Sequence, residues 1–166
     1  MAEDFSAGRQ MEKKNTTYLT KEGLDNLKKE LKDLIEVKRP EIAKRIQDAR
    51  EMGDISENSE YDSAKQEQAY IEGRIAELED ILKYAKVTET VGRKDYVDIG
   101  ANVTVHIDGG DNTFRIVGAP EADPIANKIS HESPLGSALL GKKVGDKIQV
   151  EAPVGKLNYT ILKIEY

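Results

Sequence analysis

The stretch "EMGDISENSEYDSAK", residues 51–65, decides the fold, because two long segments with helical spacing of apolar residues meet there. Upstream, leucines recur at intervals of three and four after Thr20, which is the predicted N-cap of the first helix. Downstream, apolar positions alternate at three and four from Tyr61 to Ala85, which is the seam of a coiled coil. Only the short "GDISEN" joins the segments, so the two helices are predicted to fold back as an antiparallel hairpin.

Pro40 interrupts the first helical segment. Proline lacks an N–H and its ring clashes with the preceding turn, so the sequence predicts a kink or one disturbed turn at this point. The apolar stripe slips there and continues through Ile42, Ile46 and Ala49.

Carboxylates crowd the connection between the helices: Asp48, Glu51, Asp54, Glu57, Glu60 and Asp62. Capping of the second helix by Asp54 or Ser56, with acids at its positive dipole end, explains one or two of them. Asp54, Glu57 and Glu60 recur every third residue, which sets neighbouring carboxylates close together at a helix start. Mg²⁺ keeps several waters and often takes only one or two protein carboxylates. We therefore expect half of a metal site, which another molecule completes.

Basic residues lie behind the acidic connection: Lys44, Arg45, Arg50, Lys65 and Arg74. Spacing alone leaves two interpretations open. They form a solvated face with ion pairs along each helix, or they contact a phosphate chain led toward the acids.

The chain after Val87 loses the helical period and is predicted to form a small α+β domain. Strands are expected at Val103–Ile107 and Thr113–Val117, and two more in "DKIQVEA" and "LNYTILKIEY". "SPLGSALLG" is typical of a short helix with Ser133 as N-cap and Pro134 in its first turn. This part shows no catalytic constellation, so a docking role is expected.

Composition excludes several classes of function. The 166-residue chain has a net charge of −6 and a pI near 5.1, which argues against unaided binding to nucleic acid, so any such contact is expected to be indirect. It contains no cysteine, which fits a reducing cytoplasm. No run approaches the roughly 18 apolar residues of a membrane span. His106 and His131 are far apart in the sequence and are expected to be structural or exposed.

The segment "RPEIAKRIQDAREMGDISENSEYDSAKQEQAYIEGRIAELEDIL" resembles the helical hairpin of the bacterial Gre transcript-cleavage factors. "EADPIANKISHESPLGSALLGKKVGD" resembles the start of that family's C-terminal domain, and the similarity runs from about Tyr18 to the end of the chain. The resemblance implies an α+β protein with a flexible segment at 1–17, a coiled-coil hairpin at 18–90 with its acidic tip at 54–60, and an FKBP-like domain at 91–166.

The resemblance also implies a function. Gre factors bind RNA polymerase through the C-terminal domain at the β′ rim, insert the hairpin into the secondary channel, and stimulate the polymerase's own cleavage of backtracked RNA. They have no catalysis or cofactor of their own, and we expect a monomer that needs no membrane. The carried-over residues are Asp54 and Glu57, which help hold the polymerase's second Mg²⁺, Glu60 with a weaker role, Arg50 and Lys65 at the RNA 3′ end, and Ser130, Ser133 and Pro134 for docking. Family members often have Arg at the Lys65 position, and lysine lacks its bidentate geometry.

Three alternatives stay open. An anti-cleavage relative would block the same channel, although such relatives vary the tip acids, and Asp54 and Glu57 are both present here. A prolyl isomerase would need an aromatic pocket, and the chain has two Phe and no Trp. A plain coiled-coil adaptor would use the acids only as solvated caps.

Overall fold

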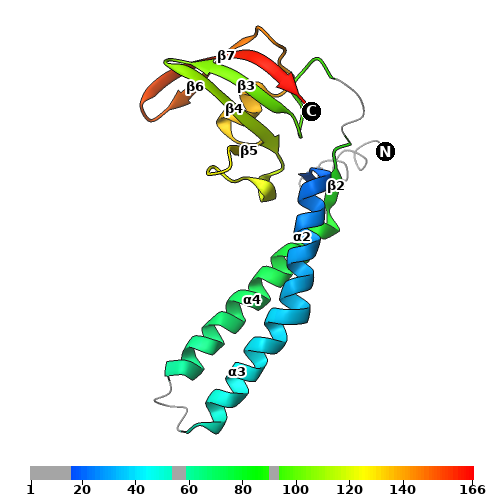
Figure 1. The fold of residues 1–166 in the computed structure, drawn as a ribbon, viewed down its shortest axis with the longest axis vertical. Coiled ribbons are helices and arrows are strands. Elements are labelled where there is room, and N and C mark those ends of the chain that lie inside the picture. The colour runs from blue at the N-terminus through cyan, green and yellow to red at the C-terminus, as the bar shows by residue number, and fades with distance from the viewer. Residues whose placement is uncertain (1–15, 54–58, 90–93) are drawn as a thin grey trace, which may run out of the picture. The chain divides into compact units, whose positions relative to one another are not determined.

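The computed structural model describes residues 16–53, 59–89 and 94–166. It shows an α+β chain with a helical N-terminal region and a C-terminal sheet, as the sequence predicts (Figure 1). Contacts divide it into two compact units: a helical unit, Asp25–Tyr84, and a sheet unit, which joins the described residues up to Leu24 with Ala85–Tyr166. The sheet unit thus includes the described chain before the first helix, α2 (Lys21–Asp33), and the first residues of that helix.

The helices are α2 (Lys21–Asp33), the π-helical turn η1 (Leu34–Lys38), α3 (Arg39–Glu51) and α4 (Ser59–Lys83). In the helical unit α3 and α4 lie side by side and run antiparallel (Figure 1). Their apolar stripes meet in a core of Ile42, Ile46, Ala64, Ile71 and Ile75, against which Leu31, Leu34, Ile35 and Tyr61 pack. The predicted seam is buried at Ala64, Ile71, Ile75 and Leu78, and Leu82 is half-buried in the last turn of α4. Ala85 was expected to close it but instead begins a strand.

The disturbance expected at Pro40 is the π-helical turn η1. The backbone N–H of Arg39 bonds to the carbonyl of Leu34, five residues back, rather than to the residue four back. Because Pro40 has no N–H to donate and its ring needs room in the preceding turn, the wider π-turn accommodates it at little cost. Beyond the turn Ile42 and Ile46 are buried again.

Five strands form the sheet, in the order β5-β4-β3-β7-β6. Their bounds are β3 Asn102–Ile107, β4 Gly110–Val117, β5 Lys128–Ser130, β6 Lys147–Ala152 and β7 Gly155–Glu165. All neighbours are antiparallel except β4 and β5. Leu139 of the short helix α5 (Pro134–Leu139) joins the core of the sheet unit, which includes Val103, Val105, Ile116 and Ile161.

A second, two-stranded sheet pairs β1 (Thr17–Leu19) in parallel with β2 (Ala85–Val87). Leu19 is fully buried, and its carbonyl accepts the N–H of Thr88 at 3.0 Å. The chain just before the first helix and the chain just after the last helix of the hairpin are therefore held together. No described helix is long and apolar enough to cross a membrane.

Candidate functional site

The end of the hairpin lies between the last turn of α3 and the first turn of α4. Asp54 and Glu57, the predicted metal-sharing acids, fall between these helices and lie outside the described residues. Near this end of the hairpin, the guanidinium carbon of Arg50 in the last turn of α3 is 5.8 Å from the ring centroid of Tyr61 on α4. This cation–π contact joins the two helix ends that flank the acidic segment.

Glu60, the third predicted tip acid, is bound to an arginine of the opposite helix. The Nη2 of Arg45 donates to Glu60 Oε1 at 2.8 Å, and its Nη1 donates to Glu67. Hydrogen bonds to Glu60 and to Glu67 raise the pKa of the Arg45 guanidinium above its ordinary value. The sequence placed Glu60 among the acids and Arg45 in the basic zone, and the structure pairs them.

Two further arginines of the helical unit also cross between helices. Both nitrogens of the Arg39 fork donate to Glu72 at 2.7 Å. Arg74 donates to Glu30 at 2.6 and 3.0 Å, and to Glu77 of its own helix at 2.9 Å. The ion-pair interpretation therefore holds for Arg45 and Arg74, mostly across the hairpin instead of along one helix.

Arg50 and Lys65, the cations assigned to RNA, behave differently. Neither forms an ion pair with a carboxylate in the part of the chain that the structure describes, and both side chains are exposed. Lys65 Nζ donates to the Gln68 side chain at 2.8 Å. Their positive charge is thus less offset than that of Arg45.

The predicted docking residues gather in one compact turn before α5. Ser133 Oγ donates to the carbonyl of Ser130 at 2.7 Å and accepts the N–H of Gly136 at 3.0 Å, so its predicted role as N-cap is confirmed. Ser130 Oγ accepts the N–H of Glu132 at 3.1 Å, and Pro134 is exposed at the first helical position. A Cβ on Gly136 would lie 2.0 Å from the Ser130 carbonyl oxygen, so only glycine allows this close approach. The turn is held by its own hydrogen bonds.

The histidines have structural partners. The His131 ring meets Tyr18 edge-on at 5.8 Å between centroids, and its Nδ1 lies 3.3 Å from the carbonyl oxygen of Val117. His106 Nδ1 lies 2.7 Å from Asp111 on the neighbouring strand, and this pair is exposed. Among the described residues, the ring nitrogens of the two histidines have hydrogen-bond contacts only with Asp111 and the Val117 carbonyl.

Glu121 is a structural side chain that sequence reasoning missed. Its carboxylate accepts the N–H of Thr20 at 2.8 Å, the Thr20 hydroxyl, and the N–H of Gly118 at 3.3 Å. Thr20 in turn caps α2 by accepting the Gly23 N–H at 3.0 Å, which confirms its prediction as N-cap. The only local signal was Gly23, a poor helix former inside the first turn, whose added Cβ would lie 2.0 Å from the Glu121 carboxyl carbon.

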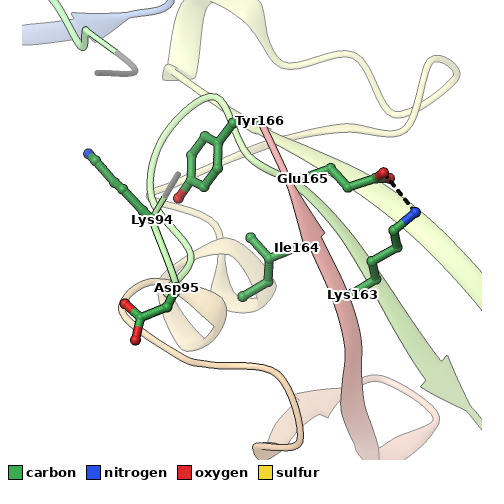
Figure 2. Close-up of a pocket in the computed structure, with 6 residues that line it drawn as sticks. All are labelled: Lys94, Asp95, Lys163, Ile164, Glu165 and Tyr166. Carbon is green, nitrogen blue, oxygen red and sulfur yellow. Dashed lines mark ion pairs between the residues drawn. The ribbon is translucent and has the colours of Figure 1, made fainter. Parts of the chain in front are cut away.

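A cavity of about 460 Å³ lies beside the end of β7. Figure 2 shows its lining: Lys94, Asp95, Lys163, Ile164, Glu165 and Tyr166. Lys163 and Glu165 pair at 2.7 Å, and the Tyr166 hydroxyl donates to the Tyr96 carbonyl at 2.6 Å, while burial raises the pKa of that hydroxyl. None of the predicted site residues lines this cavity. Within the described ranges no group of three or more acidic or histidine side chains is placed to hold a metal ion.

Comparison with known proteins assigns both parts of the chain. Residues 17–87 match the model "Transcription elongation factor, N-terminal" of GreA and GreB, and residues 92–166 match the corresponding C-terminal model. The transcription elongation factor GreA of Lactococcus lactis subsp. cremoris is 51% identical over 153 residues, covering 90% of this chain and 98% of that protein. GreA of Thermoanaerobacter pseudethanolicus is 55% identical over 149 residues, covering 88% and 95%.

Among solved structures, the GreA factor homolog Gfh1 of Thermus thermophilus is 34% identical and covers 91% of this chain and 99% of that chain. Its TM-score of 0.43 is too low to support any statement about how the parts are arranged. The family models and the GreA relatives span nearly the whole described chain. The chain therefore belongs to the GreA/GreB family of transcription elongation factors and is of the GreA type.

Proposed function

We propose that this protein inserts its hairpin into the secondary channel of RNA polymerase and stimulates the polymerase's own cleavage of backtracked RNA. The observation that carries the proposal is the α3–α4 pair: it has its own apolar core, arginine–glutamate pairs join its helices, and it ends in an acid-rich segment. Membership of the GreA/GreB family supports the same function.

Asp54 and Glu57 are the residues that we propose to act at the polymerase's active centre. Phosphodiester hydrolysis with two metal ions uses one cation at the attacking oxygen and one at the leaving oxygen. A polymerase engaged in synthesis holds its second Mg²⁺ partly through the phosphates of the incoming nucleotide, which a backtracked complex lacks. Two carboxylates brought by the hairpin would replace those ligands and orient the attacking water. This accounts for a concentration of like charge larger than helix capping requires.

Arg50 and Lys65 are proposed to contact the RNA backbone near its 3′ end. An arginine already bonded to two carboxylates has little positive potential left for a phosphate, whereas these two side chains are exposed and have no carboxylate partner among the described residues. Arg50 stacks on Tyr61, which fixes its guanidinium without neutralising it. Backbone contacts of this kind position a nucleic acid without reading its sequence.

The C-terminal sheet, which we propose to be FKBP-like, is the docking part, with the Ser130–Pro134 turn against the β′ rim. Docking costs less ordering entropy when the contacting turn is already fixed, as the hydrogen bonds of Ser130 and Ser133 fix this one. We further propose that the protein works as a cytoplasmic monomer, that it brings no cofactor, and that all catalysis belongs to the polymerase.

The test uses RNA polymerase stalled in a backtracked complex with 5′-labelled transcript, Mg²⁺ and this protein. Shortened RNA with the wild-type chain, and none with an Asp54→Ala/Glu57→Ala variant that still binds polymerase, is the expected result. Slower nucleotide addition without shortening would instead identify an anti-cleavage factor. Equal effects of both proteins would leave the acids no role beyond capping.

A further inference from the structure

An arginine–glutamate pair ties the first turn of α4 to α3. α4 begins at Ser59, so Glu60, bound by Arg45 Nη2 at 2.8 Å, lies at the point where the chain enters this helix. The second nitrogen of the same fork is held by Glu67. Glu60 and Glu67 are seven residues apart, which places them two turns apart on one face of α4. Arg45 therefore bridges both carboxylates: Glu67 anchors the guanidinium, and the guanidinium holds Glu60.

No other described arginine pairs with a carboxylate at this position, and Arg50 reaches the same turn through the Tyr61 ring. Arg39 also crosses between α3 and α4, but its Nε and Nη2 donate to a single carboxylate, Glu72, which lies farther from the acidic segment. Arg74 binds Glu30 and Glu77, which also lie away from the start of α4. Arg39 is thus a matched control: the same residue types, the same two helices and similar exposure, at another distance from the hairpin end.

We propose that Arg45 is a positioning residue for transcript cleavage: through Glu60 it fixes the start of α4 beside the acidic segment, and Glu60 acts through Arg45 instead of binding the polymerase's Mg²⁺. This inference rests on the proposed function. A carboxylate already bonded to a guanidinium is a weaker ligand for a cation, because the arginine offsets its charge. The same bond holds a helix end in place, and misplacing reacting groups by about 1 Å can cost about a hundredfold in rate.

Stability and positioning are separable here. Exposed ion pairs contribute little to the free energy of unfolding, and the Arg45 and Glu60 side chains are 42% and 61% exposed. Loss of the pair therefore leaves the helical unit folded by its apolar core. A fall in cleavage without a fall in helicity is the signature of positioning.

The first experiment measures cleavage of backtracked RNA against the concentration of full-length wild type, Arg45→Gln, Arg45→Lys and Arg39→Gln. We expect Arg45→Gln to lower the rate at saturating protein by about three- to tenfold with an unchanged half-saturating concentration. Arg45→Lys, a single point donor, should recover only part of the rate. Arg39→Gln should match the wild type. Equal rates for Arg45→Gln and wild type, or equal losses in both glutamine variants, would overturn the inference.

A double-mutant cycle distinguishes positioning from metal binding. If Glu60 acts through Arg45, Arg45→Gln/Glu60→Gln should be no slower than the slower single variant, and the Mg²⁺ concentration for half-maximal cleavage should stay constant. The proposal would be contradicted if the rate losses of the two single variants multiplied in the double variant and Glu60→Gln raised the Mg²⁺ concentration for half-maximal cleavage. Glu60 would then be a ligand of the metal ion. Absence of cleavage by the wild type would refute the proposed function itself.

A measurement on the free protein keeps the positioning step testable even then. The chain contains no cysteine, so Met52→Cys and Ser63→Cys, both at exposed positions, provide unique sites for nitroxide labels. Pulsed EPR should give a broader distance distribution with Arg45→Gln than with the wild type or Arg39→Gln. An unchanged distribution would show that Arg45 does not fix the helix end, and a broadening in both variants would show that its position is not special.

Discussion

Replacing Gly23 by alanine should destabilise the wild-type protein and stabilise a variant without the Glu121 carboxylate. Alanine in a helix is ordinarily favoured over glycine by up to about 1 kcal/mol. Here the new Cβ would lie 2.0 Å from both Cδ and Oε1 of Glu121, far inside contact distance. Since glutamate is flexible, the carboxylate will move out instead of the backbone, and it will lose its hydrogen bonds.

The magnitude follows from those bonds. Glu121 accepts the N–H and the hydroxyl of Thr20 and the N–H of Gly118. At about 1 kcal/mol for each partly buried donor left unpaired, Glu121→Ala should cost about 3 kcal/mol. Gly23→Ala in the wild type should cost about 2 kcal/mol, the same loss less the helix propensity gained. In the Glu121→Ala background the same change should stabilise by up to about 1 kcal/mol.

The assay is equilibrium urea unfolding of the four full-length proteins of this cycle, followed by far-UV circular dichroism. Amide hydrogen exchange at Thr20 and Gly118 reports locally, and protection there should fall in both single variants. Glu151→Ala, at an exposed carboxylate in β6, is the control and should change stability by less than about 0.5 kcal/mol. If Gly23→Ala changes the free energy of unfolding by the same amount and in the same direction in both backgrounds, the contact with Glu121 does not explain why position 23 is a glycine.

Three further predictions concern other parts of the chain. Ile71→Ala, in the hairpin core and 4% exposed, should cost about 2–4 kcal/mol in urea unfolding, and a loss below about 1 kcal/mol would contradict the packing described. Ser133→Ala removes the cap of α5 and should lower the free energy of unfolding by about 1 kcal/mol. It should also weaken polymerase binding in a pull-down titration, and unchanged binding would show that the turn has no part in docking. The hydrogen bond from Arg115 lowers the pKa of Glu22, so this pair stabilises the fold above the ordinary glutamate pKa and the contribution is lost as the pH falls through the lowered value. Glu22→Gln should therefore flatten the dependence of unfolding free energy on pH between about pH 5 and 3, and an unchanged slope would show that the pair contributes nothing.

The sequence predicted the features whose signals are local. The apolar stripe of α4 and the caps Thr20 and Ser133 depend on residues three or four positions apart, so a short window contains the whole pattern. Strands β3 and β4 were found for the same reason: both end at the expected residue and begin one and three residues earlier than expected.

The missed features join residues far apart in the chain. Thr20 and Glu121 are separated by 101 positions, and β1 pairs with β2 across the whole hairpin through only three residues on each side. Strands so short carry no periodicity. Glu121 ends the 3-10 turn Ala119–Glu121, and nothing near it in the sequence indicates that it will accept from Thr20. Arg45 and Arg74 were recognised as basic residues and Arg39 was not, and the partners of all three depend on the register between the helices. The roles of Asp54 and Glu57 remain predictions from the sequence and the family.

The π-helical turn Leu34–Lys38 has a consequence for how the hairpin tolerates changes in length. It holds one residue more than an α-helical turn would need, and Ile42 and Ile46 still reach the core beyond it. Removing one exposed residue there, such as Val37, together with Pro40→Ala, would convert the turn to ordinary α-helix and keep the later residues on the same face. A deletion within α3 itself would rotate everything beyond it by about 100° and carry its end away from α4. The π-helical turn is thus the place where the first helical segment of the hairpin can lose one residue without rotating the end of α3.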